Sequence, residues 1–323
     1  MALIFVTRQI PAVGLEALRA AGHEVVVSEK DGVLTPDELR TALAARPYEG
    51  IVSLLTDQID ATVLEAAPTI QIVANYAVGY NNVAVAALAA RGVTVTNTPG
   101  VLTDTVAEYT VALMLSVMKR IPEADRFTRA GGYDGWAPEL LLGSDLNGKT
   151  LGVVGAGRIG AGVAQRAAQG FGMQVIYHDV ARAEELEHTT GASYCAAIED
   201  LLRAADVVSL HVPLLPATTH LINAERLALM KPSAYLINTS RGPVIDEDAL
   251  VHALQEGVIR GAGLDVFEAE PSLTPGLAAL ENVVLTPHIA SASEETRGRM
   301  SELVAENLIA FFAGGTPPHV VTA

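Results

Sequence analysis

The 323-residue sequence predicts an α/β protein with two domains, each a doubly wound parallel sheet covered by helices. Short apolar runs alternate with amphipathic helical stretches along the whole chain, as in proteins built on parallel sheets. The length suffices for two domains that each bury a core. Half of the residues are hydrophobic and only 18% are charged, which excludes a disordered chain.

The first hundred residues predict one complete small domain. Strands are expected at 3–6, 24–27, 50–53, 70–74 and 93–96, and helices at 11–21, 35–45 and 61–67. A long helix is expected over 103–121, with Thr103 and Asp104 as capping candidates. Residues 122–146 are rich in glycine and proline and are expected to be irregular. So long a segment is either functional or an arm that packs on something.

A second series of strands begins after Lys149. Six strands are expected, at 150–154, 174–177, 207–211, 234–238, 261–265 and 283–286, which makes a full dinucleotide-binding (Rossmann-like) unit. A last helix near 293–313 follows after this unit is complete. We therefore expect a discontinuous substrate domain of residues 1–98 and 289–323, a cofactor domain of residues 99–288, and a ligand cleft between them.

The composition limits the macromolecular partners. A formal charge of −16 argues against nucleic acid and against anionic membrane surfaces. The most apolar helical stretch, 111–118, is too short to span a bilayer, and the N-terminus lacks a signal-peptide pattern. The single cysteine, Cys195, excludes an intramolecular disulfide and has no recognisable base beside it. A cytoplasmic location is expected, and a buried apolar role for Cys195 is favoured over a catalytic thiol.

A glycine pattern marks the expected cofactor site. Gly155-Ala156-Gly157-Arg158-Ile159-Gly160 has the spacing G-x-G-x-x-G, follows a predicted strand and opens a predicted helix. The first glycine allows the tight turn, the second lets a pyrophosphate approach the backbone, and the third lets the helix pack on the strand. Phosphates would lie at the helix N-terminus, where free N–H groups and the dipole favour negative charge.

Asp179 follows the next strand, where an acidic residue accepts hydrogen bonds from the adenosine ribose hydroxyls. A carboxylate there repels a 2′-phosphate, so the sequence favours NAD over NADP. The alternative is that Asp179 only caps the next segment. Arg182 stands nearby and could pair with a 2′-phosphate.

Three residues after the carboxyl ends of later strands suggest the chemistry. Arg241 follows the strand 234–238, Glu270 follows 261–265, and His288 follows 283–286. Ligands gather at this edge of a parallel sheet. Arg can hold a carboxylate in a planar fork, His can transfer a proton near neutral pH, and a carboxylate can orient the imidazole. This set suits hydride transfer to or from a small 2-oxo or 2-hydroxy acid.

Each of the three also has a structural interpretation. Arg241 could be a surface arginine, Glu270 a charge before Pro271, and His288 a hydrogen-bonded core histidine. The functional interpretation depends on all three following strands of the same domain.

These motifs closely resemble the D-isomer-specific 2-hydroxyacid dehydrogenases from end to end. The shared patterns are Gly155 to Gly160, Asn238-Thr239-Ser240-Arg241-Gly242, Gly263-Leu264-Asp265-Val266-Phe267 with Glu270-Pro271, and Thr286-Pro287-His288-Ile289. The resemblance implies that Arg241 binds and polarises the substrate, that His288 is the acid/base and that Glu270 supports His288. Within the family, the stretches around Trp136, Asp145 and His288 look most like glyoxylate/hydroxypyruvate reductases.

The resemblance also implies the binding residues and partners. Leu54, Val78 and Gly79 are expected, with Arg241, to contact the substrate, and Asn81 can cap a helix after the Val78–Gly79 loop. No metal is expected, and a homodimer through the cofactor domains is implied, with the 122–146 arm reaching the partner. Phosphite dehydrogenase and an NAD-sensing corepressor-like scaffold remain alternatives. The implied cofactor contacts are Thr103, Gly155, Gly157, Arg158, Ile159, Gly160, Asp179, Val212, Pro213, Thr218, Thr239, Asp265, His288 and Ser291.

Overall fold

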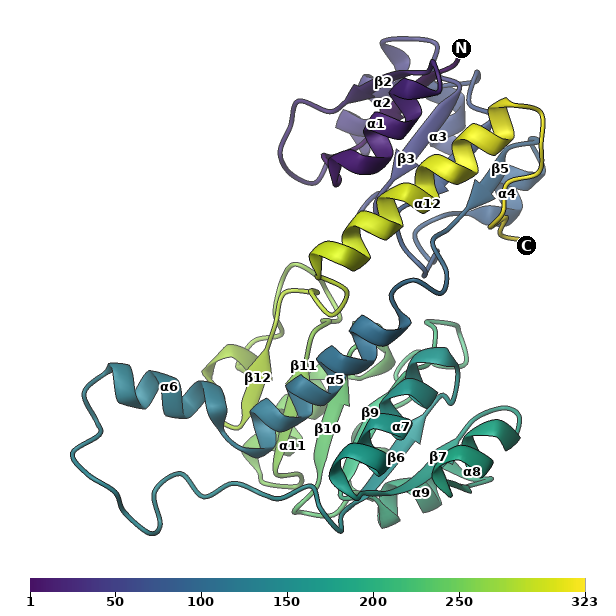
Figure 1. Ribbon diagram of the computed structural model, residues 1–323. Helices are drawn as coiled ribbons and strands as arrows, with labels where there is room; N and C mark the ends of the chain where they lie inside the picture. Colours follow the sequence, from purple (N-terminus) through teal and green to yellow (C-terminus); the bar gives the residue numbers. More distant parts are fainter. Residues whose placement is uncertain (323) are drawn as a thin grey trace. The chain divides into compact units, whose positions relative to one another are not determined.

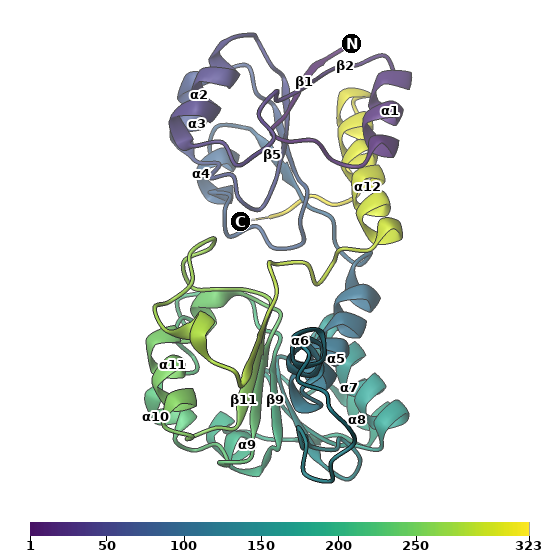
Figure 2. The ribbon, with the colours of Figure 1, turned by 90° about the vertical axis from the view of Figure 1, so that its left-hand side faces the viewer.

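A computed structural model describes residues 1–322, which form two compact units (Figure 1). One unit, called unit 1 here, combines Met1–Leu102 with residues 292–322; the other, unit 2, is Thr103–Ser291. Each holds one all-parallel sheet with helices on both faces (Figure 2). The predicted α/β architecture with two doubly wound sheets is confirmed.

Unit 1 contains a five-stranded sheet in the order β2-β1-β3-β4-β5. Helices α1 and α12 cover one face, and α2, α3 and α4 cover the other (Figure 2). Since all strands are parallel, their carboxyl ends meet at one edge. The strands are β1 Leu3–Val6, β2 Glu24–Val27, β3 Gly50–Ser53, β4 Ile72–Asn75 and β5 Thr94–Thr96, and the helices are α1 Ala12–Ala20, α2 Pro36–Ala44, α3 Ala61–Ala66, α4 Val85–Ala89 and α12 Glu294–Phe312.

Local sequence signals explain where these helices begin and how they pack. Thr35 caps α2 in a capping box with Glu38, and Ser293 caps α12. Helix α12 lies beside α1 (Figure 1). Gly14 is needed at this contact, because a Cβ there would lie 2.0 Å from the carbonyl oxygen of Ser301. Close helix packing therefore ties the C-terminal helix to the first hundred residues.

Unit 2 contains a seven-stranded sheet in the order β12-β11-β10-β9-β6-β7-β8. Helices α5, α7 and α8 lie on one face, and α9, α10 and α11 lie on the other (Figure 2). The strands are β6 Thr150–Val154, β7 Gln174–His178, β8 Ser193–Tyr194, β9 Val207–Leu210, β10 Tyr235–Asn238, β11 Gly261–Leu264 and β12 Val283–Leu285. The helices are α5 Thr103–Met118, α6 Ile121–Arg129, α7 Arg158–Phe171, α8 Glu184–Thr190, α9 Ile198–Ala204, α10 Ala224–Leu227 and α11 Glu247–Gln255.

Two sequence-based expectations for unit 2 were wrong. The sheet has a seventh strand, β8, which is only two residues long and pairs with β7. The segment 122–146 is not wholly irregular, since α6 occupies Ile121–Arg129. Arg120 has a left-handed backbone (φ 56°), which ends the long helix and turns the chain into α6. Helix α6 leads away from the sheet, and residues 130–148 form an arm that returns to the start of β6 (Figure 1).

The helices of residues 1–322 include none that combines the length and the apolar character needed to cross a membrane.

Candidate active site

The glycine turn after β6 has the geometry that an approaching phosphate requires. Gly155 has φ 94°, a conformation that favours glycine, and its N–H donates to His178 O at 2.9 Å. A Cβ on Gly160 would lie 2.0 Å from Gly155 O, so α7 can pack on β6 only with glycine there. A Cβ on Gly157, the N-cap of α7, would meet open space. The first turn of α7 holds no acidic residue. This cradle fits a pyrophosphate.

Asp179 closes the cradle from the end of β7. Its Oδ2 accepts a hydrogen bond from Ala156 N at 2.7 Å, and its Oδ1 accepts one from Val180 N at 2.6 Å. The carboxylate therefore lies against the glycine turn, and each oxygen keeps a lone pair for a ribose hydroxyl. The cap of α8 is Ala183, so Asp179 is not the N-cap of that helix.

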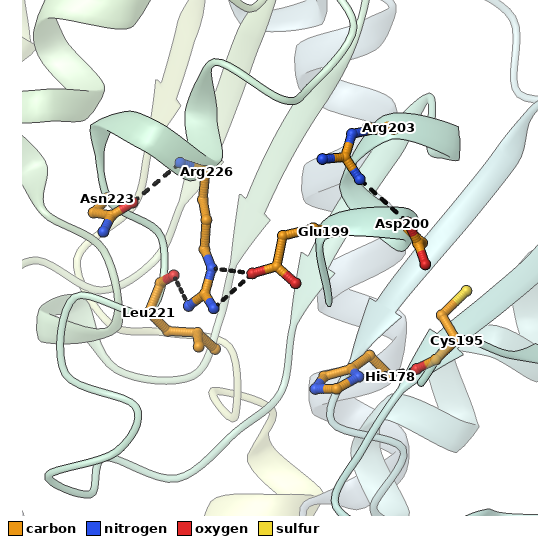
Figure 3. Close-up of polar contacts among 8 residues, drawn as sticks. All are labelled: His178, Cys195, Glu199, Asp200, Arg203, Leu221, Asn223 and Arg226. Carbon is orange, nitrogen blue, oxygen red and sulfur yellow. Dashed lines mark hydrogen bonds and ion pairs between the residues drawn. The ribbon is translucent and has the colours of Figure 1, made fainter. Parts of the chain in front are cut away.

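His178 and Cys195 take structural positions on the neighbouring strands. His178 Nδ1 lies 2.9 Å from the carbonyl oxygen of Cys195, which ties the end of β7 to the residue after β8 (Figure 3). Burial raises the pKa of the Cys195 thiol, a direction opposite to that of a reactive cysteine. Within residues 1–322, no three His, Cys, Asp or Glu side chains gather as a metal site.

His288 lies in a turn that wraps around a buried carboxylate. Asp265, at the end of β11, accepts hydrogen bonds from Ile289 N at 2.9 Å, Ala290 N at 2.8 Å and the Thr286 hydroxyl at 2.7 Å. Burial raises the pKa of Asp265, although these three hydrogen bonds oppose the shift. The His288 backbone is left-handed (φ 56°), a conformation that such a residue keeps only when its surroundings hold it there. The turn thus presents one imidazole at a fixed place.

Glu270 holds the imidazole of His288. Its Oε2 lies 3.0 Å from His288 Nδ1, and its Oε1 accepts Phe267 N at 3.0 Å. Burial raises the pKa of Glu270, but the hydrogen bond and charge of His288 outweigh burial, and the net shift is downward. Glu270 is therefore ionised at neutral pH. It orients the ring so that Nε2 is the nitrogen left for other partners.

Arg241 follows β10 on a turn that Asn238 builds. Asn238 is buried; its Nδ2 donates to Arg241 O at 2.9 Å, and its Oδ1 accepts Ser240 N at 3.0 Å. Gly242 packs against the chain before Glu270, since a Cβ there would lie 1.9 Å from Phe267 O. Burial lowers the pKa of the Arg241 guanidinium, and the charge of Glu270 opposes this. The structure thus brings the two loops that carry Arg241 and Glu270 into contact.

The other predicted cofactor residues also lie in unit 2. Thr218 closes the turn after β9, because its hydroxyl donates to Pro213 O at 2.6 Å and accepts Leu215 N at 2.8 Å. The Thr239 hydroxyl lies 2.8 Å from that of Thr110. Thr103 begins α5, Val212 packs beside the glycine turn, and Ser291 is the last residue of the unit.

Unit 1 holds the three remaining predicted residues on two loops at the carboxyl edge of its sheet. Asn75 Nδ2 donates to Gly79 O at 2.9 Å, and Asn97 Nδ2 donates to Val78 O at 2.8 Å. Leu54 lines a pocket of about 690 Å³ whose lining also includes Tyr76. The hydrogen bonds from Asn75 and Asn97 fix the backbone of the Val78–Gly79 loop.

Leu54 is itself held by polar side chains. Its N–H donates to Asp57 Oδ2 at 2.7 Å, and its carbonyl accepts Asn82 Nδ2 at 3.0 Å. The expectation that Asn81 caps a helix was wrong, because α4 begins later, with Ala84 as its N-cap. Asn82, which is buried, donates to Leu54 O and Asp57 O and so helps to order this region.

Comparisons with known proteins identify the family. Residues 111–290 match the model of the D-isomer specific 2-hydroxyacid dehydrogenase NAD-binding domain. A glyoxylate reductase from Korarchaeum cryptofilum is 51% identical over 321 residues, which are 98% of this chain and 95% of that protein.

Solved structures agree as well. The NADPH-dependent glyoxylate/hydroxypyruvate reductase from Sinorhizobium meliloti, in complex with citrate, is 38% identical with a TM-score of 0.86 over 100% of this chain and 98% of that one. D-Lactate dehydrogenase from Aquifex aeolicus, complexed with NAD and lactic acid, is 31% identical with a TM-score of 0.86 over 99% of both chains.

The chain belongs to the D-isomer-specific 2-hydroxyacid dehydrogenase family.

As a member of this family, the D-2-hydroxyacid dehydrogenase is an oxidoreductase that acts on small 2-oxo and 2-hydroxy acids, as the sequence predicted. The predicted family, fold and enzyme class are therefore confirmed. A dinucleotide-binding domain is part of this family, while the choice between NAD and NADP varies among its members.

The structural roles of some residues that hold the site of this dehydrogenase escaped prediction. The turn-building roles of Asp265 and Asn238 were missed, although both stood in quoted motifs. Their signal was an amide or acidic side chain at the buried end of an apolar strand, where water cannot satisfy it. Asp57 and Asn82 in unit 1 carry the same signal less clearly, because they lie in loops.

Proposed function

We propose that this dehydrogenase reduces a glyoxylate- or hydroxypyruvate-like 2-oxo acid to the D-2-hydroxy acid, or oxidises the product in reverse, with NAD(H). The observation that carries the proposal is the contact of 3.0 Å between Glu270 Oε2 and His288 Nδ1. The loop of Arg241 packs against that of Glu270 in the same unit as the glycine turn. The relatives named glyoxylate reductase, at 45–51% identity, support the substrate class.

Each residue of the trio has one task in the proposed reduction. The nicotinamide, when bound, supplies the hydride. The Arg241 guanidinium binds the substrate carboxylate and polarises its carbonyl group. His288 donates the proton on Nε2 to the carbonyl oxygen, while Glu270 holds Nδ1–H and stabilises the charged ring. In the oxidation, His288 Nε2 takes the proton back. Leu54, Val78 and Gly79 stay predicted substrate contacts.

The glycine turn, Asp179 and the other predicted residues of unit 2 are proposed to hold the dinucleotide, with NADH preferred. The Asp179 carboxylate accepts ribose hydroxyls and repels a 2′-phosphate. We expect a preference for NADH of at least about tenfold in kcat/KM, since like charges at short range cost more than the ~1.4 kcal/mol that this factor needs.

A substrate and cofactor panel tests the proposal. Glyoxylate, hydroxypyruvate, pyruvate and larger 2-oxo acids would each be assayed with NADH and with NADPH by absorbance of the reduced nicotinamide. The proposal expects the highest kcat/KM with glyoxylate or hydroxypyruvate and NADH. A clearly better larger 2-oxo acid contradicts the substrate class, and equal efficiency with NADPH contradicts the cofactor preference. Membership in the enzyme family does not favour phosphite oxidation or a non-enzymatic scaffold, and phosphite with NAD is a negative control.

We also propose a cytoplasmic homodimer. The arm 130–148 exposes large apolar side chains, with Trp136 82%, Tyr133 58% and Leu142 57% exposed. Several large apolar side chains exposed on one segment are consistent with a protein interface. The single cysteine, which excludes an intramolecular disulfide, is consistent with a reducing compartment. Light scattering after gel filtration should give twice the mass of the chain, and Trp136→Ser should weaken the dimer. A monomer at micromolar concentration contradicts the proposal.

A further inference from the structure

The inference concerns Arg182, the cation nearest in sequence to the proposed ribose-binding residue Asp179. The loop 179–183 follows β7, and a free guanidinium there could pair with a 2′-phosphate and attract NADP. The structure gives this guanidinium another partner.

Glu187, on α8, binds the guanidinium of Arg182 with both carboxylate oxygens. Arg182 Nε lies 3.1 Å from Glu187 Oε1, and Nη2 lies 2.8 Å from Oε2. The guanidinium carbon also lies 5.8 Å from the centre of the Tyr194 ring, within the range of a cation–π interaction. Two different contacts thus hold one side chain.

The acceptor is more firmly fixed than an ordinary surface carboxylate. The Tyr177 hydroxyl donates to Glu187 Oε1 at 2.6 Å and accepts Ala183 N at 2.8 Å. Tyr177 is buried, and the Glu187 side chain is only 23% exposed, whereas that of Arg182 is 61% exposed. Glu187 is therefore the more firmly anchored partner of the pair, and Arg182 is the more exposed one.

The same cluster reaches the ribose-binding residue. The Tyr194 hydroxyl donates to the carbonyl oxygen of Asp179 at 3.2 Å, and its ring packs on Tyr177 with centres 5.4 Å apart. Arg182 is thus held beside the segment that would face a 2′-phosphate, but with its donors directed at Glu187.

We propose that Glu187 determines cofactor specificity by holding Arg182 on Tyr194 and withholding it from the 2′-phosphate of NADP. This inference rests on the proposed NADH preference and deepens it: Asp179 repels the phosphate, and Glu187 removes a nearby cation that could compensate. A 2′-phosphate must break the pair between Arg182 and Glu187 before it can gain the guanidinium.

Glu187→Gln tests the proposal by direct binding. Glutamine keeps the size and an oxygen that accepts from Tyr177, but loses the charge that grips Arg182. Calorimetric titration should show NADP⁺ binding strengthened about two- to fivefold, the range expected for a partly exposed ion pair, with NAD⁺ binding unchanged. Unchanged NADP⁺ affinity in a variant whose melting temperature is that of the wild type overturns the proposal.

A second variant separates release of Arg182 from simple loss of a negative charge. In Glu187→Gln with Arg182→Ala, the NADP⁺ gain should vanish. A gain that persists means reduced repulsion and overturns the role of Arg182. Asp200→Asn is the matched control, because it removes the acidic partner of another surface arginine of unit 2, Arg203 (Figure 3). It should leave both affinities unchanged, and a gain like that of Glu187→Gln overturns the proposal.

These measurements keep the inference distinct from the proposal beneath it. If the wild type binds NADP⁺ as tightly as NAD⁺, the proposed NADH preference fails. The effect of Glu187→Gln is a different quantity, the ratio of the NADP⁺ affinities of the variant and the wild type. It can therefore succeed or fail whatever the wild type's own preference is.

Discussion

The two units share one architecture and use the carboxyl edge of the sheet in opposite ways. In unit 1, polar side chains at the ends of β1, β3 and β4 are buried and hydrogen-bonded within the chain, whereas the buried Thr96 hydroxyl at the end of β5 has no partner within residues 1–322. Ser53 donates to Asn75 Oδ1 at 3.2 Å, and Thr7 donates to Asp57. In unit 2, the same edge carries the open turn at Gly157 and the part-exposed pair of Glu270 and His288.

This difference shows what turns a doubly wound sheet into a site. Both sheets bring strand ends together, so the fold alone does not distinguish them. Unit 1 uses its buried polar groups to fix loop backbone, as at Gly79 and Leu54. Unit 2 adds a second layer, in which buried Asp265 and Asn238 fix the turns that present other side chains. We therefore expect the chemistry to reside in unit 2, with unit 1 offering shaped backbone.

The largest expected effect removes the proposed acid/base of unit 2. His288→Ala should lower kcat about 10²–10⁴-fold, because the proton on Nε2 is lost, while NADH affinity stays nearly constant. Steady-state kinetics and a fluorescence titration of NADH measure the two effects. His252→Ala, an exposed histidine on α11, is the control. Near-normal turnover in a folded His288→Ala variant would remove His288 from the mechanism.

The next effect concerns the geometry of the cation. Arg241→Lys keeps the charge but loses the planar fork. Loss of one charge-assisted hydrogen bond, about 1.5–3 kcal/mol, corresponds to a fall in kcat/KM of about 10–100-fold. The exposed Arg260→Lys should leave the kinetics unchanged. Wild-type kinetics in Arg241→Lys would show that Arg241 does not bind the carboxylate.

A matched pair of glycines compares the two units directly. A Cβ on Gly160 would lie 2.0 Å from Gly155 O, and one on Gly14 would lie 2.0 Å from Ser301 O. Each alanine variant should therefore lose about 1–3 kcal/mol of stability through overpacking, seen as a lower melting temperature. Only Gly160→Ala should also weaken NADH binding, because it distorts the phosphate cradle. Equal loss of NADH affinity in Gly14→Ala would contradict the division of roles.

The smallest effect tests the buried carboxylate of unit 1. In Asp57 one oxygen, Oδ2, accepts both Leu54 N and the Thr7 hydroxyl, so Asp57→Asn can keep both hydrogen bonds. Burial raises the pKa of Asp57 above its ordinary value, and the hydrogen bonds only partly offset this. The ionised carboxylate is therefore a cost at neutral pH, and the variant should gain about 1 kcal/mol or less there.

The sign of the pH dependence follows from the raised pKa. The wild type binds the proton more tightly when folded, so its stability rises relative to the variant as pH falls through the raised pKa. Urea unfolding of both proteins at pH 7.5 and pH 5 measures the difference. An advantage of Asp57→Asn that grows on acidification would contradict the assignment.

Periodicity predicted most of the fold, and it failed where elements are short or unburied. Strand β8 is two residues at the sheet edge and offers no alternation to detect. Helix α6 is mostly polar and buries none of its residues, and the neighbouring glycines and Pro122 suggested irregular chain. Asn81 and Asn82 are adjacent and chemically identical, and only packing decided that Asn82 is the buried one.

The sequence by itself determined the features that depend on local spacing: the glycine turn, the acidic residue after the next strand, and the residue types of the trio. These follow from backbone conformation and from the rule that parallel strands end at one edge. Tertiary structure decided the pairings. It placed Glu270 in contact with His288 Nδ1, wrapped the 286–290 turn around Asp265, and paired Arg182 with Glu187. A hydrogen bond needs two atoms within about 3 Å, and residues on different loops reach that distance only after the sheet has formed.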